Sequence, residues 1–337
     1  MRTILQTLCA LSGVSGREDA VRTYILDALA ACGTEKKVTV DPLGNVICTL
    51  FGKKRADKQL MLAAHMDEVG LIITSITDDG FLKFETVGGI SDAALYGKRV
   101  KIGEIIGVIG CKAIHLCSKE EAEKIPKKQD LLIDIGVTAD IAKKHIQPGD
   151  VAVFDAPFTC LQSLVMGKAI DDRIGCALLL KLAEQQPPYD ITLAFTVQEE
   201  VGTRGASTAA FTVKPDIGIV VETTTAADIA EVSGDQRVCV VGDGPVVSFM
   251  DKNTLYDANL YTKIRDIANE NNIPNQTKSV VAGGNDAGSI QRAAGGSRVA
   301  AVSVPCRYLH SSTCVCSLED AENTAKLLQL LVEVLPQ

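Results

Sequence analysis

Four short apolar runs recur along the chain with helical segments between them, and this alternation constrains the fold more than any other feature. The runs are LMLAA (60–64), ITLAFTV (191–197), IGIVV (217–221) and VAAVSV (299–304). Continuous apolar runs are typical of strands buried on both faces of a sheet. Between them, residues 174–185 are predicted to form a buried helix and residues 255–272 a second helix. We therefore predict an α/β fold with a mixed sheet covered by helices on both faces.

The middle of the chain has a different character. From about residue 70 to 165, short β-rich segments alternate with turn residues, and helical periodicity is mostly absent apart from residues 139–145. This pattern predicts a small β-domain of the barrel or sandwich kind. We expect one domain built from 1–68 and 166–337, interrupted by an inserted domain at 69–165. The charged stretch at 118–130 is interpreted as a solvated loop, and no site residue is assigned to the insert.

Composition excludes several classes of function. Lys and Arg total 34 against 42 Asp and Glu, so the net charge is −8, and aromatic residues make up 4% with no Trp. Nucleic acid is therefore not an expected partner, because phosphate binding needs a basic face and bases need stacking platforms. The 11 cysteines are odd in number and mostly lie in apolar runs, which favours free thiols in a reducing, cytoplasmic compartment. No apolar stretch is long enough to predict a membrane span.

Residues suited to metal binding follow all four apolar runs. His65 follows the first, Glu199 and Glu200 follow the second, Glu222 follows the third, and His310 comes six residues after the fourth. In an open α/β sheet, ligands bind beyond the carboxyl ends of the strands. We therefore expect these side chains to lie near one another. Asp171 and Asp172, just before a predicted helix, could add a carboxylate from a loop.

The spacing within each group fits metal chemistry. Asp67 lies two residues after His65, on the same side of an extended chain, where it can accept a hydrogen bond from the imidazole and orient it. Neighbouring Glu199 and Glu200 diverge, so one can bind metal while the other reaches water. Asp171 has two oxygens that can bridge two ions. Histidine and carboxylate ligands without cysteine are typical of a catalytic site for Zn²⁺ or a similar ion.

Each group also has an ordinary structural interpretation. A single histidine at a strand end is usually a surface or hydrogen-bonded residue, and adjacent glutamates are usually solvated. An Asp pair before a helix can simply stabilise its N-terminus. The placement of all the groups at one edge of the sheet favours a shared site. The other two histidines, His115 and His145, are interpreted as structural or surface residues.

Five sequence motifs resemble the family of glutamyl aminopeptidase and the tetrahedral, TET-type metallo-aminopeptidases. In chain order they are AHMDEVG (64–70), GKAIDDRIG (167–175), VQEEVGTRGA (197–206), VAGGNDAGSI (281–290) and RYLHSS (307–312). The resemblance implies a two-metal aminopeptidase fold with an inserted PDZ-like β-barrel domain. It also implies self-assembly into dimers and tetrahedral dodecamers.

The same resemblance implies a role for each candidate residue. Glu199 would be the general base, and the metal ligands would be His65 at the first ion, Asp171 bridging both, and Glu200 with His310 at the second. The last ligand of the first ion is usually an Asp in this family. The chain has Glu222 there, a longer carboxylate that can still bind a metal.

We expect a metal-dependent aminopeptidase that removes N-terminal residues from short peptides through a water activated by two divalent ions, Zn²⁺ or Co²⁺, with Mn²⁺ also possible. Two alternatives remain open at this stage. One is another amide hydrolase on the same metals, such as a carboxypeptidase or a deacylase. The other is a non-catalytic assembly subunit that retains the fold.

Overall fold

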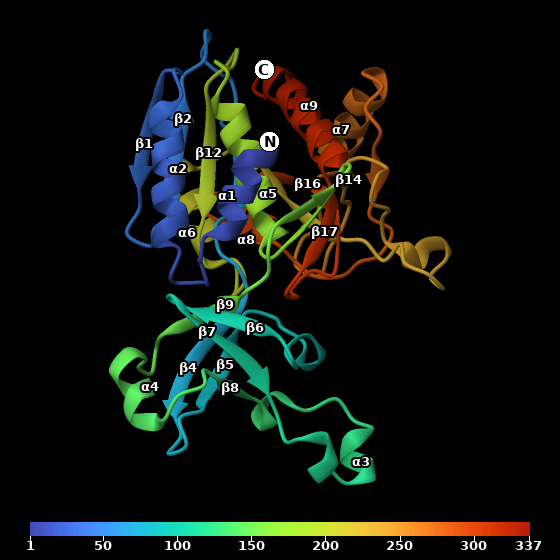
Figure 1. The fold of residues 1–337 in the computed structure, drawn as a ribbon. Coiled ribbons are helices and arrows are strands. Elements are labelled where there is room, and N and C mark those ends of the chain that lie inside the picture. Colours follow the sequence, from blue (N-terminus) through green and yellow to red (C-terminus); the bar gives the residue numbers. More distant parts are fainter.

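A computed structural model describes residues 1–337, except for the side chain of Asp235. Its main body is built on one mixed sheet (Figure 1). The strands, in their order across the sheet, are β1 (Lys36–Val40), β2 (Val46–Leu50), β12 (Ile191–Thr196), β3 (Leu60–His65), β13 (Ile217–Thr225), β16 (Arg298–Arg307), β17 (Cys314–Ser317), β11 (Leu164–Gly167) and β10 (Thr159–Leu161). Two short strands extend it beside β16, namely β14 (Val246–Val247) and β15 (Gln276–Thr277).

Helices cover both faces of this sheet, as predicted. The core on one face takes side chains from α1 (Arg2–Ala10), α2 (Asp19–Ala31), α5 (Ile170–Ala183), α7 (Ala258–Glu270) and α9 (Leu318–Val334). The core on the other face takes side chains from α6 (Arg204–Val213) and α8 (Asp286–Arg292). Strand β3 shows why its sequence is continuously apolar: Leu60, Leu62 and Ala64 face the first core, whereas Met61 and Ala63 face the second.

The centre of the sheet sets the position of the candidate site. Strands β12, β3, β13 and β16 are parallel to one another, and Thr196 at the end of β12 is paired with His65 at the end of β3. The carboxyl ends of these strands therefore lie at one edge of the sheet, which is the edge where ligands bind in such folds.

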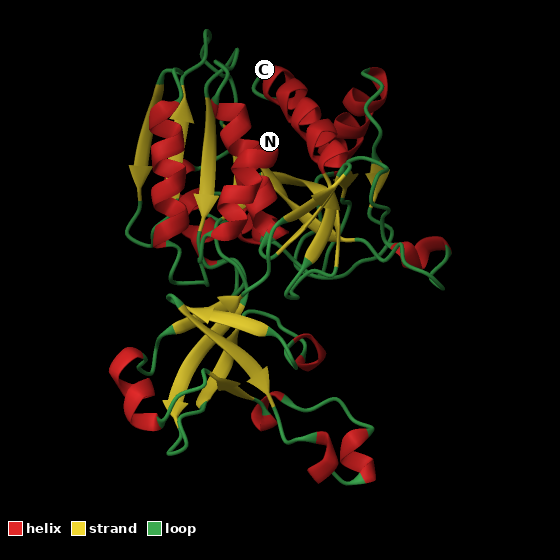
Figure 2. Cartoon of the chain, in the orientation of Figure 1, coloured by secondary structure: helices red, strands yellow, loops and turns green.

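The inserted segment forms a closed antiparallel barrel, which lies below the main body in Figure 1; strands form its wall, and loops and short helices surround it (Figure 2). In order around the barrel, its strands are β4 (Gly70–Ile76), β5 (Leu82–Val87), β8 (Leu132–Asp134), β7 (Ile105–Gly110), β6 (Arg99–Ile102) and β9 (Val151–Phe154). The barrel has its own apolar core, which includes Leu71, Phe84 and Ile133. The predicted α/β fold with an inserted β-barrel is therefore confirmed.

Short helices lie outside the barrel wall. Helix α4 (Ala139–His145) lies where helical periodicity was detected. The charged stretch at 118–130, predicted to be a loop, instead contains α3 (Lys119–Ala122), which begins at a capping box formed by Ser118 and Glu121. Four 3₁₀ turns complete the secondary structure, at Asp92–Ala94, Ile114–Leu116, Lys128–Asp130 and Gly234–Arg237. Across the described chain, no helix combines the length and apolarity that crossing a membrane requires.

A buried ion cluster fixes the junction between the two bodies. Glu68, just before the barrel, is contacted by Lys168 Nζ at 2.8 Å from both carboxylate oxygens and by Arg173 Nη2 at 3.1 Å. The backbone N–H of Gly13 donates to the same carboxylate, and Lys168 also donates to the carbonyl of Leu11. The segment that enters the barrel, the segment that leaves it and the N-terminal loop are thus joined at Glu68. Two cations pair with the charge of this carboxylate.

We predict that Glu68→Gln lowers the free energy of unfolding by about 3–5 kcal/mol, because it leaves two buried cations without their counter-charge. The matched control is Glu184→Gln, which breaks the exposed pair with Lys181 and should cost about 0–1 kcal/mol. Urea unfolding followed by circular dichroism measures both. Equal losses in the two variants would contradict the structural role of the cluster.

Candidate functional site

The predicted site residues line two adjoining cavities at the carboxyl edge of the central strands. A cavity of about 330 Å³ is lined by His65, Asp171, Glu199, Glu222 and His310, among other residues. Glu200 lines a much smaller neighbouring cavity together with Asp171 and His310. The structure therefore brings all six residues to one place. In contrast, the side chains of His115 and His145 are exposed on the barrel domain.

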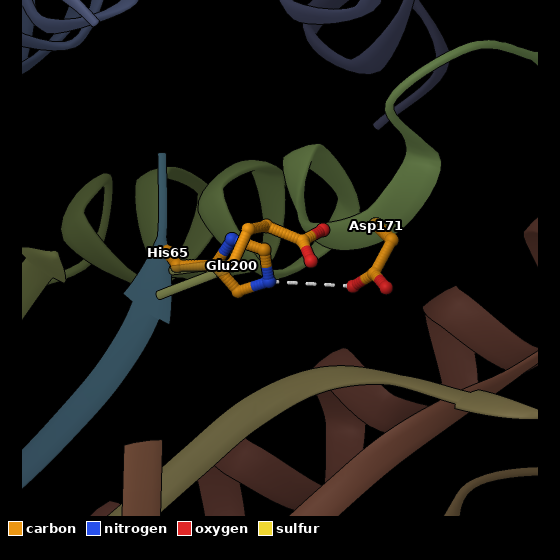
Figure 3. Close-up of side chains that lie close together, drawn as sticks. All are labelled: His65, Asp171 and Glu200. Carbon is orange, nitrogen blue, oxygen red and sulfur yellow. Dashed lines mark ion pairs between the residues drawn. The ribbon is translucent and has the colours of Figure 1, made fainter. Parts of the chain in front are cut away.

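Asp171 lies between the two histidines. Its Oδ1 is 3.4 Å from His65 Nε2, and its Oδ2 is 3.6 Å from His310 Nε2. His310 Nε2 is also 3.3 Å from Glu200 Oε2. One ligand atom each from His65, Asp171 and Glu200 lies within 4.8 Å of the others. Figure 3 shows these three side chains close together. A carboxylate with each oxygen directed at a different imidazole has the arrangement needed to bridge two ions.

Asp67 organises the surroundings of these ligands. Its carboxylate is buried and accepts hydrogen bonds from the backbone N–H of Glu199 (3.0 Å), the N–H of Glu200 (3.1 Å) and the hydroxyl of Ser15 (2.6 Å). His65 Nδ1 lies 3.4 Å from Oδ1 but makes no hydrogen bond, so the hydrogen bond predicted between the imidazole and Asp67 is replaced by a longer contact. Burial alone would raise the pKa of Asp67, but its contacts with His65 and Ser15 hold that pKa below the usual value. The carboxylate therefore stays ionised beside the imidazole.

The role of Ser15 differs from the one that its local sequence pattern indicates. Ser15 and Glu18 have the spacing of a capping box at the start of a helix. In the structure Glu18 itself is the N-cap of α2, and its side chain makes no capping bond to the helix. Instead, Glu18 Oε1 accepts hydrogen bonds from the N–H groups of Gly16 (2.7 Å) and Gln198 (3.2 Å). Glu18 thus binds the loop that carries the two glutamates directly, and Ser15 binds Asp67, which holds the same loop.

The barrel domain also contributes to the site, which the sequence did not reveal. His310 Nδ1 lies 2.9 Å from the carbonyl oxygen of Gly89, just after β5. When that nitrogen donates its proton to the carbonyl, Nε2 is left free to bind a metal. The Gly88–Gly89 pair was the available signal, because adjacent glycines can mark a close backbone approach.

Two more buried carboxylates support the site from behind. Asp172 accepts hydrogen bonds from the N–H of His65 (3.2 Å) and of Gly175 (3.0 Å), which fixes the kinked start of α5. Asp286 accepts a hydrogen bond from the hydroxyl of Thr196 at 2.6 Å. Asp286 lies inside the VAGGNDAGSI motif but was not singled out, because its role depends on a contact 90 residues away.

Several acidic side chains lie close together in the site, so burial and mutual repulsion disfavour their ionised forms. Burial, followed by repulsion from Asp171, raises the pKa of Glu200 to about 7 and that of Glu222 to about 8. Burial also raises the pKa of Glu199 well above its usual value. The nearby carboxylate of Asp171 raises the pKa of His310 to about 9. A cation bound among these groups would offset the repulsion, and two imidazoles with several carboxylates are donors that Zn²⁺ and similar ions accept.

The family model for M42 glutamyl aminopeptidases matches residues 44–327, which is most of the chain. The chain belongs to this family. It is therefore an aminopeptidase-type peptide hydrolase.

Relatives and solved structures agree with this assignment over the whole length. A provisionally named aminopeptidase of Acetivibrio thermocellus is 40% identical over 331 residues, covering 97% of each chain. The structure of an aminopeptidase from the archaeon Desulfurococcus kamchatkensis has a TM-score of 0.93 and 32% identity, covering 98% of this chain and 94% of that one. The TET1 peptidase of Pyrococcus horikoshii, described as assembling into a tetrahedron or a large octahedral shell, has a TM-score of 0.86 and 34% identity, covering 98% and 99%.

We predict that Asp67→Asn lowers aminopeptidase turnover or metal affinity about 10–100-fold, the usual loss for a group that orients a metal ligand. The asparagine amide has an NH₂ group in place of one carboxylate oxygen. This group would face a hydrogen-bond donor that the carboxylate of Asp67 now accepts from. Ser15→Ala, which removes one of the donors, should cost less than Asp67→Asn. Metal dissociation constants and kcat/KM on an aminoacyl chromogenic substrate measure the effect. A variant with wild-type values for both would show that Asp67 does not orient this site.

Proposed function

We propose that the chain is a metal-dependent aminopeptidase with two divalent ions per chain, Zn²⁺ or Co²⁺, and with Mn²⁺ also compatible with the donors. The observation that carries this proposal is the position of Asp171, whose two oxygens are directed at different histidines. Membership of an aminopeptidase family supports the proposed reaction. The crowding of Glu200 and Glu222 with other acidic side chains supports the proposed binding of cations.

Each ion would have its own ligands in addition to the shared Asp171. His65 and Glu222 would hold the first ion, and Glu200 and His310 would hold the second. Two ions held by these residues would supply Lewis acidity, which activates water and polarises a carbonyl group. Asp67 orients His65, and Gly89 orients His310.

Glu199 is the proposed general base. It lines the same cavity, its backbone is fixed by Asp67, and its carboxylate is largely buried. Burial raises its pKa, which brings a carboxyl group closer to the range suited to proton transfer. Glu199 would take a proton from the attacking water and return it to the leaving amine.

The proposed substrates are short peptides with a free N-terminus. The cavity of about 330 Å³ is at the small end of the usual range for ligand sites. Such a volume suits the end of a peptide better than the middle of a folded chain. A cytoplasmic location, expected from the cysteine usage, belongs to the same proposal.

The two neighbouring glutamates provide the sharpest test of this mechanism. Glu199→Gln keeps the shape and removes the basic group, so we predict near-normal metal content with kcat lowered by about 10²–10⁴-fold. Glu200→Gln weakens a metal–oxygen bond, so we predict loss of the second ion and partial recovery of activity in excess metal. Metal stoichiometry and steady-state kinetics are measured on both variants.

The opposite pattern would exchange the two roles: Glu199→Gln losing metal while Glu200→Gln keeps both ions. A panel of peptides with free and blocked N-termini completes the test with the wild-type enzyme. Preference for blocked peptides would indicate a deacylase, and removal of C-terminal residues would indicate a carboxypeptidase. Full metal content without turnover of any peptide would indicate a non-catalytic subunit.

We also propose that the chain forms a homo-oligomer, with a tetrahedral dodecamer as the expected form, as described for the Pyrococcus horikoshii TET1 peptidase. In this proposal residues 1–68 and 166–337 are the catalytic domain, and the inserted domain at 69–165 serves assembly or substrate access. Large apolar side chains are exposed on that domain, including Ile114 and Leu116, which are 68% and 63% exposed. Such side chains are typical of surfaces that become buried against another chain.

We predict that wild-type protein with metal sediments as a large oligomer, and that Ile114→Asp with Leu116→Asp shifts it towards smaller species. Charges placed in an apolar interface lose hydration without gaining a partner. Val40→Asp, at a residue 46% exposed on β1, is the control outside the barrel. A wild-type monomer at micromolar concentration would contradict the assembly.

A further inference from the structure

The side chain of Glu222 is held in a way that the sequence did not anticipate. Its Oε1 accepts a hydrogen bond from the amide Nδ2 of Asn285, the N-cap residue of α8. Among the described residues, no other group donates to this carboxylate, so Oε2 keeps no protein partner. One oxygen of Glu222 is therefore fixed, and the other stays available in the cavity that both residues line.

The orientation of the Asn285 amide follows from its other contacts. Its Oδ1 accepts a hydrogen bond from the backbone N–H of Ala287 at 2.9 Å, so the oxygen must point to the helix. The second hydrogen on Nδ2 is directed at the hydroxyl oxygen of Tyr256, at 2.9 Å. Both amide hydrogens and the amide oxygen thus have partners, and a flipped amide would place an N–H group against the donor from Ala287.

Tyr256 is itself held from behind. Its hydroxyl donates to Asp251 Oδ2 at 2.6 Å, while Asp251 Oδ1 accepts from the N–H groups of Asn253 and Thr254, each at 2.7 Å. Asp251, Tyr256 and Asn285 are all buried, with exposed fractions of 2%, 5% and 6%. A continuous hydrogen-bonded chain therefore runs from a fixed turn to the carboxylate of Glu222.

The type of donor matters as much as its position. Glu68 is held by Lys168 and Arg173, which neutralise it. An amide holds a carboxylate without supplying a formal charge, so a bound cation would still be needed to balance an ionised Glu222. A glutamate also has one more rotatable bond than an aspartate, and a fixed donor limits that additional freedom.

We infer that Asn285, supported by Tyr256 and Asp251, is a positioning residue that holds Glu222 ready for the first metal ion. The inference rests on the proposed two-metal function and deepens it. It makes the affinity of one of the two ions depend on a residue that does not itself touch metal.

The test compares divalent-ion binding to apo-protein, prepared with a chelator, by calorimetric titration with Zn²⁺ and by the visible absorption of Co²⁺. Asn285→Ser retains a helix-capping hydroxyl but lacks the amide donors. We expect it to bind one ion normally and the other about 10–100-fold more weakly. Tyr256→Phe should weaken the same ion less. Tyr261→Phe, which removes a hydroxyl bonded to Thr277 instead, is the matched control and should bind both ions normally.

A double-mutant cycle separates positioning from general destabilisation. The shorter side chain in Glu222→Asp should not reach Asn285, so adding Asn285→Ser to Glu222→Asp should cause no further loss of affinity. Full and independent losses from the two changes would overturn the inference, as would two normal ions in Asn285→Ser. A wild-type protein that binds no divalent ion would overturn the proposed function along with the inference, whereas the first two outcomes leave that function intact.

Discussion

Three separate segments of the chain direct hydrogen-bond donors or an imidazole at one buried carboxylate, that of Asp67. The N-terminal loop supplies the hydroxyl of Ser15, the loop after β12 supplies the N–H groups of Glu199 and Glu200, and the end of β3 supplies His65. A buried carboxylate needs such partners, because an unpaired charge away from water is costly. The geometry of the site therefore depends on this contact. Without the carboxylate of Asp67, Glu199, Glu200 and His65 would no longer be held in position relative to one another.

The protein treats its buried acids in two distinct ways. At the junction between the bodies, Glu68 is paired with two cations and its charge is fully used. At the edge of the central sheet, Glu200 and Glu222 are held close to other carboxylates, and burial with mutual repulsion raises the pKa of each. The first arrangement joins parts of the chain. The second crowds acidic side chains together, so that a bound cation would stabilise their ionised forms.

The parts of the site that follow from sheet topology could be predicted from sequence. Parallel strands have their carboxyl ends at one edge, so the residues after four apolar runs identified the cavity without knowledge of any contact. Contacts that depend on tertiary structure could not be predicted. Ser15 matched a local capping pattern but bonds to a residue 52 positions away. Gln198 and His310 adopt left-handed backbone angles, with φ of 56° and 57°, and neither is a glycine that would have marked such a turn. Their conformations are imposed by the surrounding structure.

The carbonyl of Gly89 holds the ring of His310 although the two residues belong to different bodies of the molecule. Gly88 beside it has a φ of +83°, and a side chain there would come within 3.3 Å of Glu200 and closer still to Val69. The site thus includes residues of both domains, because the barrel contributes the carbonyl of Gly89. The barrel could be exchanged between related proteins, by recombination or by design. The site would be preserved only if the new barrel kept a turn after β5 that places a carbonyl oxygen beside His310. The turn that carries Gly89 is therefore constrained together with His310, although it belongs to the insert.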